Sequence, residues 1–114
     1  MNPGSLVILH LAQPTEKFWG VLLRLAGEGI TVRGINLSSF DDWARAVARR
    51  EATLDLATMF VPLFRVERMF LDEQVGEVES YSQRFHRMAG VAVESHLGLG
   101  VSEGGARDEP GLVS

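Results

Sequence analysis

Three histidines are the only residues through which this chain could present imidazole to a metal ion or a reacting group: His10, His86 and His96. His86 and His96 are ten positions apart, which on a continuous helix separates them by about 15 Å at 1.5 Å per residue. One metal ion cannot bridge that distance. The chain has no cysteine, so thiolate ligands, thiol catalysis and disulfides are excluded. The sequence therefore predicts no metal site, and we expect partly buried or exposed imidazoles.

Two pairs of adjacent acids, Asp41–Asp42 and Asp72–Glu73, contain carboxylates that general acid–base catalysis could use. Adjacent side chains point in different directions, and the first pair falls at an expected helix start, where negative charge is stabilising. Ser38 and Ser39 lack the Gly-x-Ser-x-Gly elbow, and no Gly-x4-Gly-Lys phosphate loop occurs. The sequence thus predicts no catalytic residues and no cofactor, and it favours a protein that is not an enzyme.

Arginine is the residue type that could bind phosphate here, because ten of the eleven basic residues are arginines. Two of the candidates share an expected helix and the others fall on expected strands, so the fold could gather them into an RNA- or phosphate-binding surface. The interpretation that we favour is that nearby acids neutralise them and leave a solvated, salt-bridged surface. The candidate set is Arg33, Arg45, Arg49, Arg65 and Arg68.

Charge and composition limit the classes of function. The 114 residues carry a formal net charge of −4, whereas proteins that coat nucleic acid are usually basic because neutralised phosphates supply their affinity. With 46% hydrophobic and 23% charged residues, we expect one globular domain over 1–99. Residues 100–114 are glycine-rich and acidic, which predicts a disordered tail. No long apolar run or export signal is visible, so we expect a cytoplasmic protein without a membrane contact.

The first half of the chain alternates between strand and helix signals. Ser5–Leu11 is rich in β-forming residues and predicts a strand. Phe18–Leu25 fits either an amphipathic helix or a strand. Gly20 lies in its middle, where it would cost a helix about 1 kcal/mol relative to alanine, and a glycine-containing loop follows. We therefore predict a hairpin with the β-rich stretch Ile30–Leu37.

Two helices and two further strands complete the expected elements. Ser39 with Asp42 fits a capping box and predicts a helix from Phe40 to about Ala52. Ser80 with Gln83 fits another and predicts a last helix, weakened at Gly90 and ended by Gly98 or Gly100. Strands are expected over Leu54–Val61 and Phe64–Leu71, with Pro62 interrupting between them because it cannot donate to a ladder.

This order of elements resembles the Sm-like family of small barrels. The similarity lies in Val7-x-Leu9, Gly20-x-Leu22 and the stretch Phe60–Met69, and it covers Ser5–Leu71. It implies a mainly β, α+β fold: a five-stranded barrel with one helix inserted mid-chain and one at the C-terminal end. In that family, neighbouring subunits pair strands to close a ring. Closure also removes exposed strand edges.

The family's RNA-contacting residues do not carry over. Sm-like proteins bind uridines through Asp-x-x-Asn after the second strand and Arg-Gly or Lys-His before the last. Here those places read Leu25-Ala-Gly-Glu-Gly and Val61-Pro-Leu-Phe, and Arg33-Gly34 lies on a different strand. The chain also resembles a small group of uncharacterised bacterial proteins, which brings no known activity. That likeness lies in Phe18-Trp-Gly20, Arg33-Gly-Ile35, Ser39-Phe-Asp-Asp-Trp-Ala-Arg45 and Arg65-Val-Glu-Arg-Met69.

Large aromatic side chains are numerous for so small a barrel, and we expect some of them to form a seam between copies. The predicted interface residues are Trp19, Phe60 and Phe64. The leading functional interpretation is a homo-oligomeric, non-enzymatic interaction module. The alternatives are a selective RNA-binding protein that uses the arginines, and a small-ligand binder or enzyme with a site between subunits. In the last case Asp41, Arg45 and Arg65 would converge.

Overall fold

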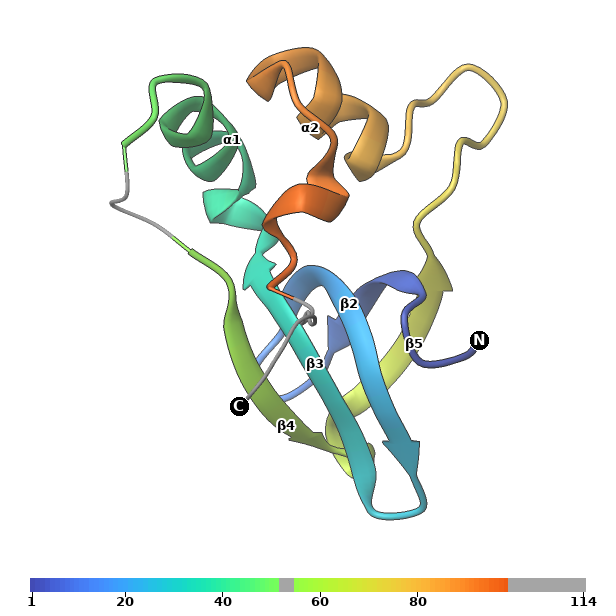
Figure 1. Ribbon diagram of the computed structural model, residues 1–114. Helices are drawn as coiled ribbons and strands as arrows, with labels where there is room; N and C mark the ends of the chain where they lie inside the picture. The colour runs from blue at the N-terminus through green and yellow to red at the C-terminus, as the bar shows by residue number, and fades with distance from the viewer. Residues whose placement is uncertain (52–54, 99–114) are drawn as a thin grey trace.

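The computed structural model describes residues 1–51 and 55–98, which form one five-stranded antiparallel sheet and two α-helices (Figure 1). The strands are β1 (Leu6–Leu11), β2 (Glu16–Ala26), β3 (Gly29–Asn36), β4 (Ala57–Pro62) and β5 (Val66–Leu71). The helices are α1 (Phe40–Ala48) and α2 (Tyr81–Ala89), with short 3₁₀ helices η1 (Leu37–Ser39), η2 (Leu63–Arg65) and η3 (Val93–His96). The predicted α+β class is confirmed.

The segment that fitted both a helix and a strand is a strand. Residues 16–26 form β2, which pairs with β3 as the predicted hairpin and with β1 on its other side. Where Gly20 faces Gly34, the two backbones approach so closely that a Cβ on either glycine would collide with the opposite strand. Glycine is therefore required in the middle of this ladder by the close approach of the backbones.

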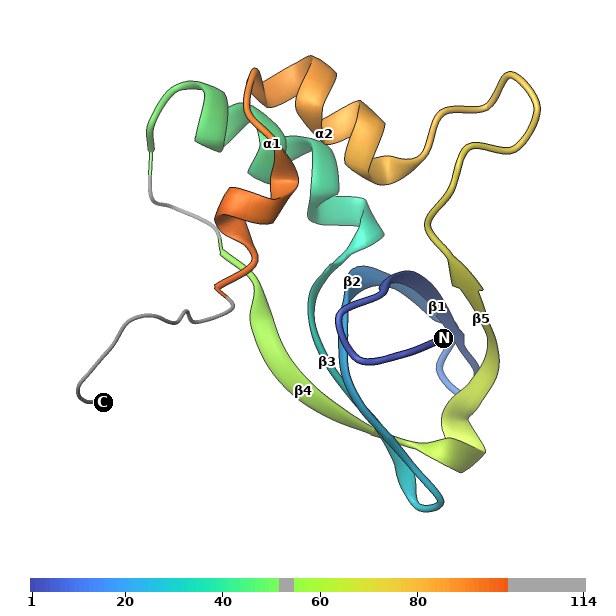
Figure 2. The same cartoon turned by 45° about the vertical axis from the view of Figure 1, so that its right-hand side comes forward.

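The sheet is strongly curled but is not closed into a barrel (Figure 2). Its strand order is β4-β3-β2-β1-β5, so β4 and β5 are the two edges. They follow each other in the chain through η2, where the N–H of Leu63 donates to the carbonyl of Glu28 at 3.1 Å. In the described residues, however, β4 pairs only with β3 and β5 only with β1. The expectation of a closed barrel is not met.

Two hydrophobic cores lie on opposite faces of the curled sheet. The inner core receives side chains from every strand, as expected inside a curl, and its buried members are Val7, Leu9, Leu11, Leu22, Ile30, Val32 and Val61. The helix-side core lies between the outer face and the two helices, and its largest members are Trp19, Phe40, Trp43 and Phe85. Because successive residues of a strand face opposite sides, β2 contributes Leu22 to the first core and Trp19 and Val21 to the second.

Helix α1 begins at Phe40 as predicted, but its cap differs. Ser39 has helical backbone angles and makes no capping hydrogen bond, because a capping residue requires an extended backbone. The chain enters through η1 instead, where Asn36 accepts a hydrogen bond from the N–H of Ser38 at 2.9 Å.

The same helix ends at Ala48, not near Ala52, and Ala52 itself lies outside the described residues. The N–H of Glu51 donates to the carbonyl of Ala46, and that of Arg50 to Val47. This pair of hydrogen bonds forms a Schellman motif. It places Arg50 at φ 58°, a left-handed conformation that costs a non-glycine residue about 1 kcal/mol.

The other boundaries moved by a few residues. The predicted strand over Leu54–Val61 is β4, Ala57–Pro62, so Pro62 ends the strand and does not interrupt it. The strand predicted from Phe64 begins at Val66, because residues 63–65 turn as η2. The last helix has the predicted capping box at Ser80 and Gln83 but ends at Ala89, because Gly90 follows in a left-handed conformation with φ 81°. The predicted tail, 100–114, lies outside the described residues.

Asp72 joins the sheet to α2. It follows β5, and its carboxylate accepts hydrogen bonds from the indole Nε1 of Trp19 at 2.9 Å and from the N–H groups of Tyr81 and Ser82 at 2.7 and 2.9 Å. The hydroxyl of Ser80 accepts from the N–H of Gln83, and the N–H of Ser80 donates to the side-chain carbonyl of Gln83 at 2.7 Å. The four N–H groups that a helix start leaves unpaired are thus all satisfied.

We expect Asp72→Ala to lower the free energy of unfolding by about 3 kcal/mol, because it removes a helix cap and leaves a buried indole N–H unpaired. Urea denaturation followed by tryptophan fluorescence measures the change. Glu73→Ala is the matched control, since Glu73 is exposed and such surface substitutions shift stability by about 0.5 kcal/mol or less. Equal losses in the two variants would contradict the role given to Asp72.

Candidate functional site

The β4 edge of the sheet is apolar and exposed. Strand β4 contains no charged residue, and Phe60 at its centre is 54% exposed. Beyond its end, Phe64 in η2 is 88% exposed, and Leu63 beside it is also exposed. Natural edge strands are usually protected by charges, bulges or covering segments. An uncharged edge with two exposed phenylalanines is typical of a surface that pairs with another chain.

The β5 edge, at the other side of the sheet, is also partly apolar. Phe70 is 42% exposed and packs edge-on against His10, with 5.1 Å between ring centroids. Burial, together with the charges of Lys17 and Arg68, lowers the pKa of His10 below its usual value. The charges on β5 itself are opposite, Glu67 and Arg68, with 3.8 Å between carboxylate and guanidinium. Exposed Leu71, Val75 and Val78 continue the apolar surface.

Trp19, the third predicted interface residue, has no exposed surface. Its indole packs between Phe40 and Trp43, at centroid distances of 5.4 and 5.8 Å, beneath helix α1. Trp19 therefore holds the helices on the sheet and offers no contact to a second copy. Sequence analysis missed Leu63 and Phe70. The position of Leu63 directly after Pro62 at a corner was the available signal for the first.

Arg65 is held inside the molecule's own structure. Its guanidinium donates to the carbonyls of Ala12 and Pro14 and pairs with Glu16 at 3.0 Å. These contacts fasten η2 to the turn between β1 and β2. Arg33 donates to Thr58 on β4 and lies against Gly98. Neither arginine projects freely toward an external phosphate.

The other three candidate arginines form exposed ion pairs with near neighbours. Arg45 pairs with Asp42 and Arg49 with Glu51, each at 3.2 Å, and Arg68 lies near Glu67. Helix α1 and η2 lie at opposite ends of the sheet (Figure 1). The five predicted arginines are therefore spread over α1 and the residue that caps it, β3, η2 and β5, and one copy of the chain does not gather them into one surface.

The expected convergence of Asp41 with Arg45 and Arg65 is not found within one copy. Asp41 forms a two-bond ion pair with Arg84 of α2, at 2.8 and 2.6 Å. Arg84 also reaches Glu79, which Arg87 binds at 2.6 Å. The hydrogen bond and charge of Arg84 hold the pKa of Asp41 below its usual value, and Asp41 in turn raises the pKa of Arg84. This network fastens α1 to α2.

The histidines lie on separate elements, β1, α2 and η3. Across residues 1–51 and 55–98, no group of three His, Asp or Glu side chains is placed to hold a metal ion. None of the helices in those ranges is long and apolar enough to cross a membrane.

Comparisons with protein-family models, with curated proteins and with solved structures find no match for this chain.

We expect acid to weaken the contribution of Asp41 to stability. A carboxylate whose pKa is lower in the folded than in the unfolded chain stabilises the fold above about pH 4, and this contribution is lost as the pH falls through the folded value. The stability deficit of Asp41→Asn should therefore be largest near about pH 6 and shrink toward about pH 3. Chemical denaturation at both pH values measures it.

Asp42→Asn is the matched control, because the Asp42 carboxylate is 73% exposed and its pair with Arg45 is a surface pair. Its deficit should be small at both pH values. A deficit of Asp41→Asn that does not change with pH would show that the pair with Arg84 does not stabilise the fold.

Proposed function

We propose that this protein is a cytoplasmic interaction module that assembles with copies of itself, the β4 edge of one copy pairing with the β5 edge of the next. The observation that carries the proposal is the uncharged β4 edge with Phe60 exposed at its centre. Backbone N–H and C=O groups on such an edge can extend a sheet into a second molecule. A second copy offers, on β5, an edge of equal length, six residues each.

The two edges can pair so that inner-face residues lie opposite inner-face residues and outer-face residues opposite outer-face residues. Met59 and Val61 pack against the inner core, so Phe60 between them points to the outer face. On β5, Met69 packs against the inner core, and Phe70 points outward beside His10. An antiparallel register that places Phe60 opposite Phe70 also places Val61 opposite Met69. Aromatic pairs directly across two strands stabilise a sheet by about 0.2 to 1 kcal/mol.

Assembly through two different edges has a geometric consequence. A contact that joins unlike surfaces repeats head to tail, so it closes a ring or continues as a filament. The Sm-like resemblance supports the ring, because subunits of that family pair strands in this way. In this proposal each free edge of the curled sheet, which one copy leaves unpaired, pairs with a strand of a neighbouring copy.

Selective RNA binding is the second candidate function, and it requires assembly to bring arginines from different copies together. Arg45, Arg49 and Arg68 are exposed at more than half of their side chains, so neighbouring copies could form a basic surface from them. Binding of this kind weakens steeply with salt, because phosphate contacts release counterions. The ultraviolet absorbance ratio of the purified protein at low and high salt tests it.

Light scattering at micromolar concentration should give a mass of several chains, in low and in high salt. We expect Phe60→Lys to reduce that mass to one chain, because a charge at the centre of the edge opposes pairing. Val91→Lys, which places the same charge at an exposed apolar residue after α2, should keep the wild-type mass. A wild-type monomer would refute self-assembly, and an unchanged mass for Phe60→Lys would refute the β4 edge as the contact.

The register can be tested because the chain has no cysteine of its own. We expect mixed Phe60→Cys and Phe70→Cys proteins to form, on oxidation, a disulfide-linked dimer that contains one of each. Cross-strand Cβ atoms lie about 5 Å apart, near the separation that a disulfide needs. Each variant oxidised alone is the control and should remain mostly uncrosslinked. Equal crosslinking in all three samples would contradict this register.

A further inference from the structure

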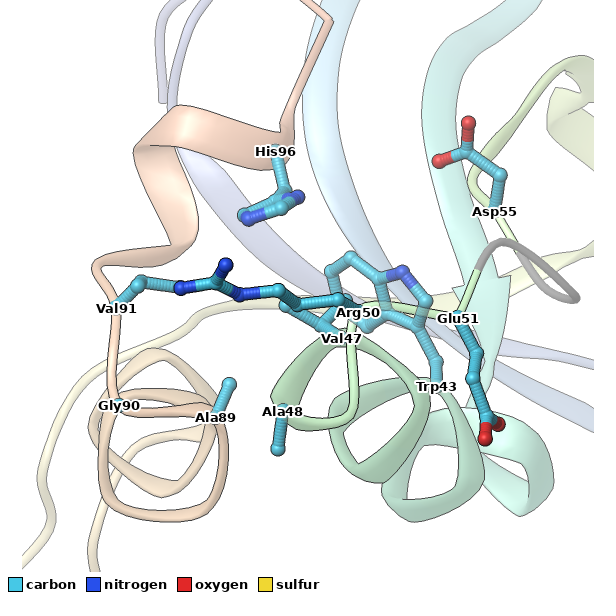
Figure 3. Close-up of a pocket in the computed structure, with 10 residues that line it drawn as sticks. All are labelled: Trp43, Val47, Ala48, Arg50, Glu51, Asp55, Ala89, Gly90, Val91 and His96. Atoms are coloured by element: carbon cyan, nitrogen blue, oxygen red, sulfur yellow. The ribbon is translucent and has the colours of Figure 1, made fainter.

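A pocket of about 640 Å³ lies where the C-terminal ends of α1 and α2 meet η3 (Figure 3). Small-molecule sites commonly have volumes of about 300 to 1,000 Å³. Its floor is apolar and comes from both helices and the segment after α2: Trp43, Val47, Ala48, Ala89 and Val91. The polar residues of its rim are Arg50, Glu51, Asp55 and His96. The pocket lies apart from the aromatic edges through which we propose that copies assemble.

Arg50 is the unusual residue of this pocket. It occupies the left-handed position of the Schellman motif that ends α1, with φ 58°, where glycine is the common residue. Strained backbone of this kind is concentrated at functional sites. The motif aims the side chain over the pocket, where Figure 3 shows it extended. Within the described part of the chain Arg50 has no ion pair, since the adjacent Glu51 pairs with Arg49.

His96 supplies a second polar group to the same opening. Its ring packs on Phe85, with 5.8 Å between centroids, and Figure 3 shows it facing the cavity above Arg50. No hydrogen bond holds its ring nitrogens among residues 1–51 and 55–98. A guanidinium and an imidazole both carry N–H donors, which can hydrogen-bond an anionic group.

The other rim residues restrict the charge of the ligand. Asp55 and Glu51 lie on the opposite side of the opening from His96 (Figure 3), and their carboxylates repel a strongly charged anion. A phosphate dianion is therefore disfavoured. A ligand with one singly charged carboxylate can hydrogen-bond Arg50 and His96 through that group. Its apolar body can pack on the floor formed by Trp43 and Val47. We infer that this pocket binds a small organic acid of that kind, a ring-sized apolar group bearing one carboxylate.

Phenylacetate is a suitable probe, with phenylacetamide as its uncharged counterpart and inorganic phosphate as the third ligand. We expect phenylacetate to shift the NMR signals of the Trp43 indole and the His96 ring saturably, with a dissociation constant of about 1 mM. The amide should bind about tenfold more weakly, because it cannot form the charge-assisted bond. No saturable shift, equal binding of the amide, or tighter binding of phosphate would overturn the inference.

Two substitutions at Arg50 separate binding from folding. Arg50→Gln should weaken phenylacetate binding about tenfold or more, whereas the control Arg45→Gln, which alters a surface pair with Asp42 outside the pocket, should leave it unchanged. Arg50→Gly should abolish binding and at the same time raise the thermal midpoint, because glycine relieves the strained conformation. Unchanged binding in Arg50→Gly would show that the guanidinium does not contact the ligand. Repeating the titration with Phe60→Lys keeps the result independent of self-assembly.

Discussion

The carboxylate of Asp72 determines how the helices sit on the sheet. It accepts one hydrogen bond from an indole in the outer face of β2 and two from the first turn of α2. The indole belongs to a fully buried residue, so leaving its N–H without a partner would cost more than the bond contributes. One residue thus sets the position of β5, β2 and α2 together. The pair between Asp41 and Arg84 then fixes α1 against α2.

This arrangement leaves the two ends of the molecule with different surfaces. The helices cover the outer face of the sheet only around Trp19, and the aromatic cluster there closes the helix-side core. Away from the helices, Phe60 and Phe64 are exposed, whereas Val61 beside Phe60 is buried in the inner core. All five strands contribute apolar side chains to the interior of this curled sheet. Its exposed aromatic side chains are therefore not needed there and are free to contact another molecule.

Several elements could be predicted because local chemistry decided them. Gly20 correctly favoured a strand over a helix, and the capping box at Ser80 located the start of α2. Other features depended on tertiary contacts. Whether Phe60 or Met59 faces the core depends on the register of β4 with β3, which alternation alone leaves open. The role of Arg50 could not be foreseen either, because Arg49-Arg50-Glu51 contains none of the glycine that normally marks a Schellman motif.

The facing glycines of β2 and β3 have a consequence for how this sequence can vary. A Cβ at Gly20 or Gly34 would meet backbone atoms of the opposite strand, and no side chain lies there to move aside. Neither a compensating change at the other glycine nor repacking of a core relieves such a clash. Two positions without side chains are therefore less tolerant of mutation than the buried residues beside them, and any viable variant of the hairpin must retain both.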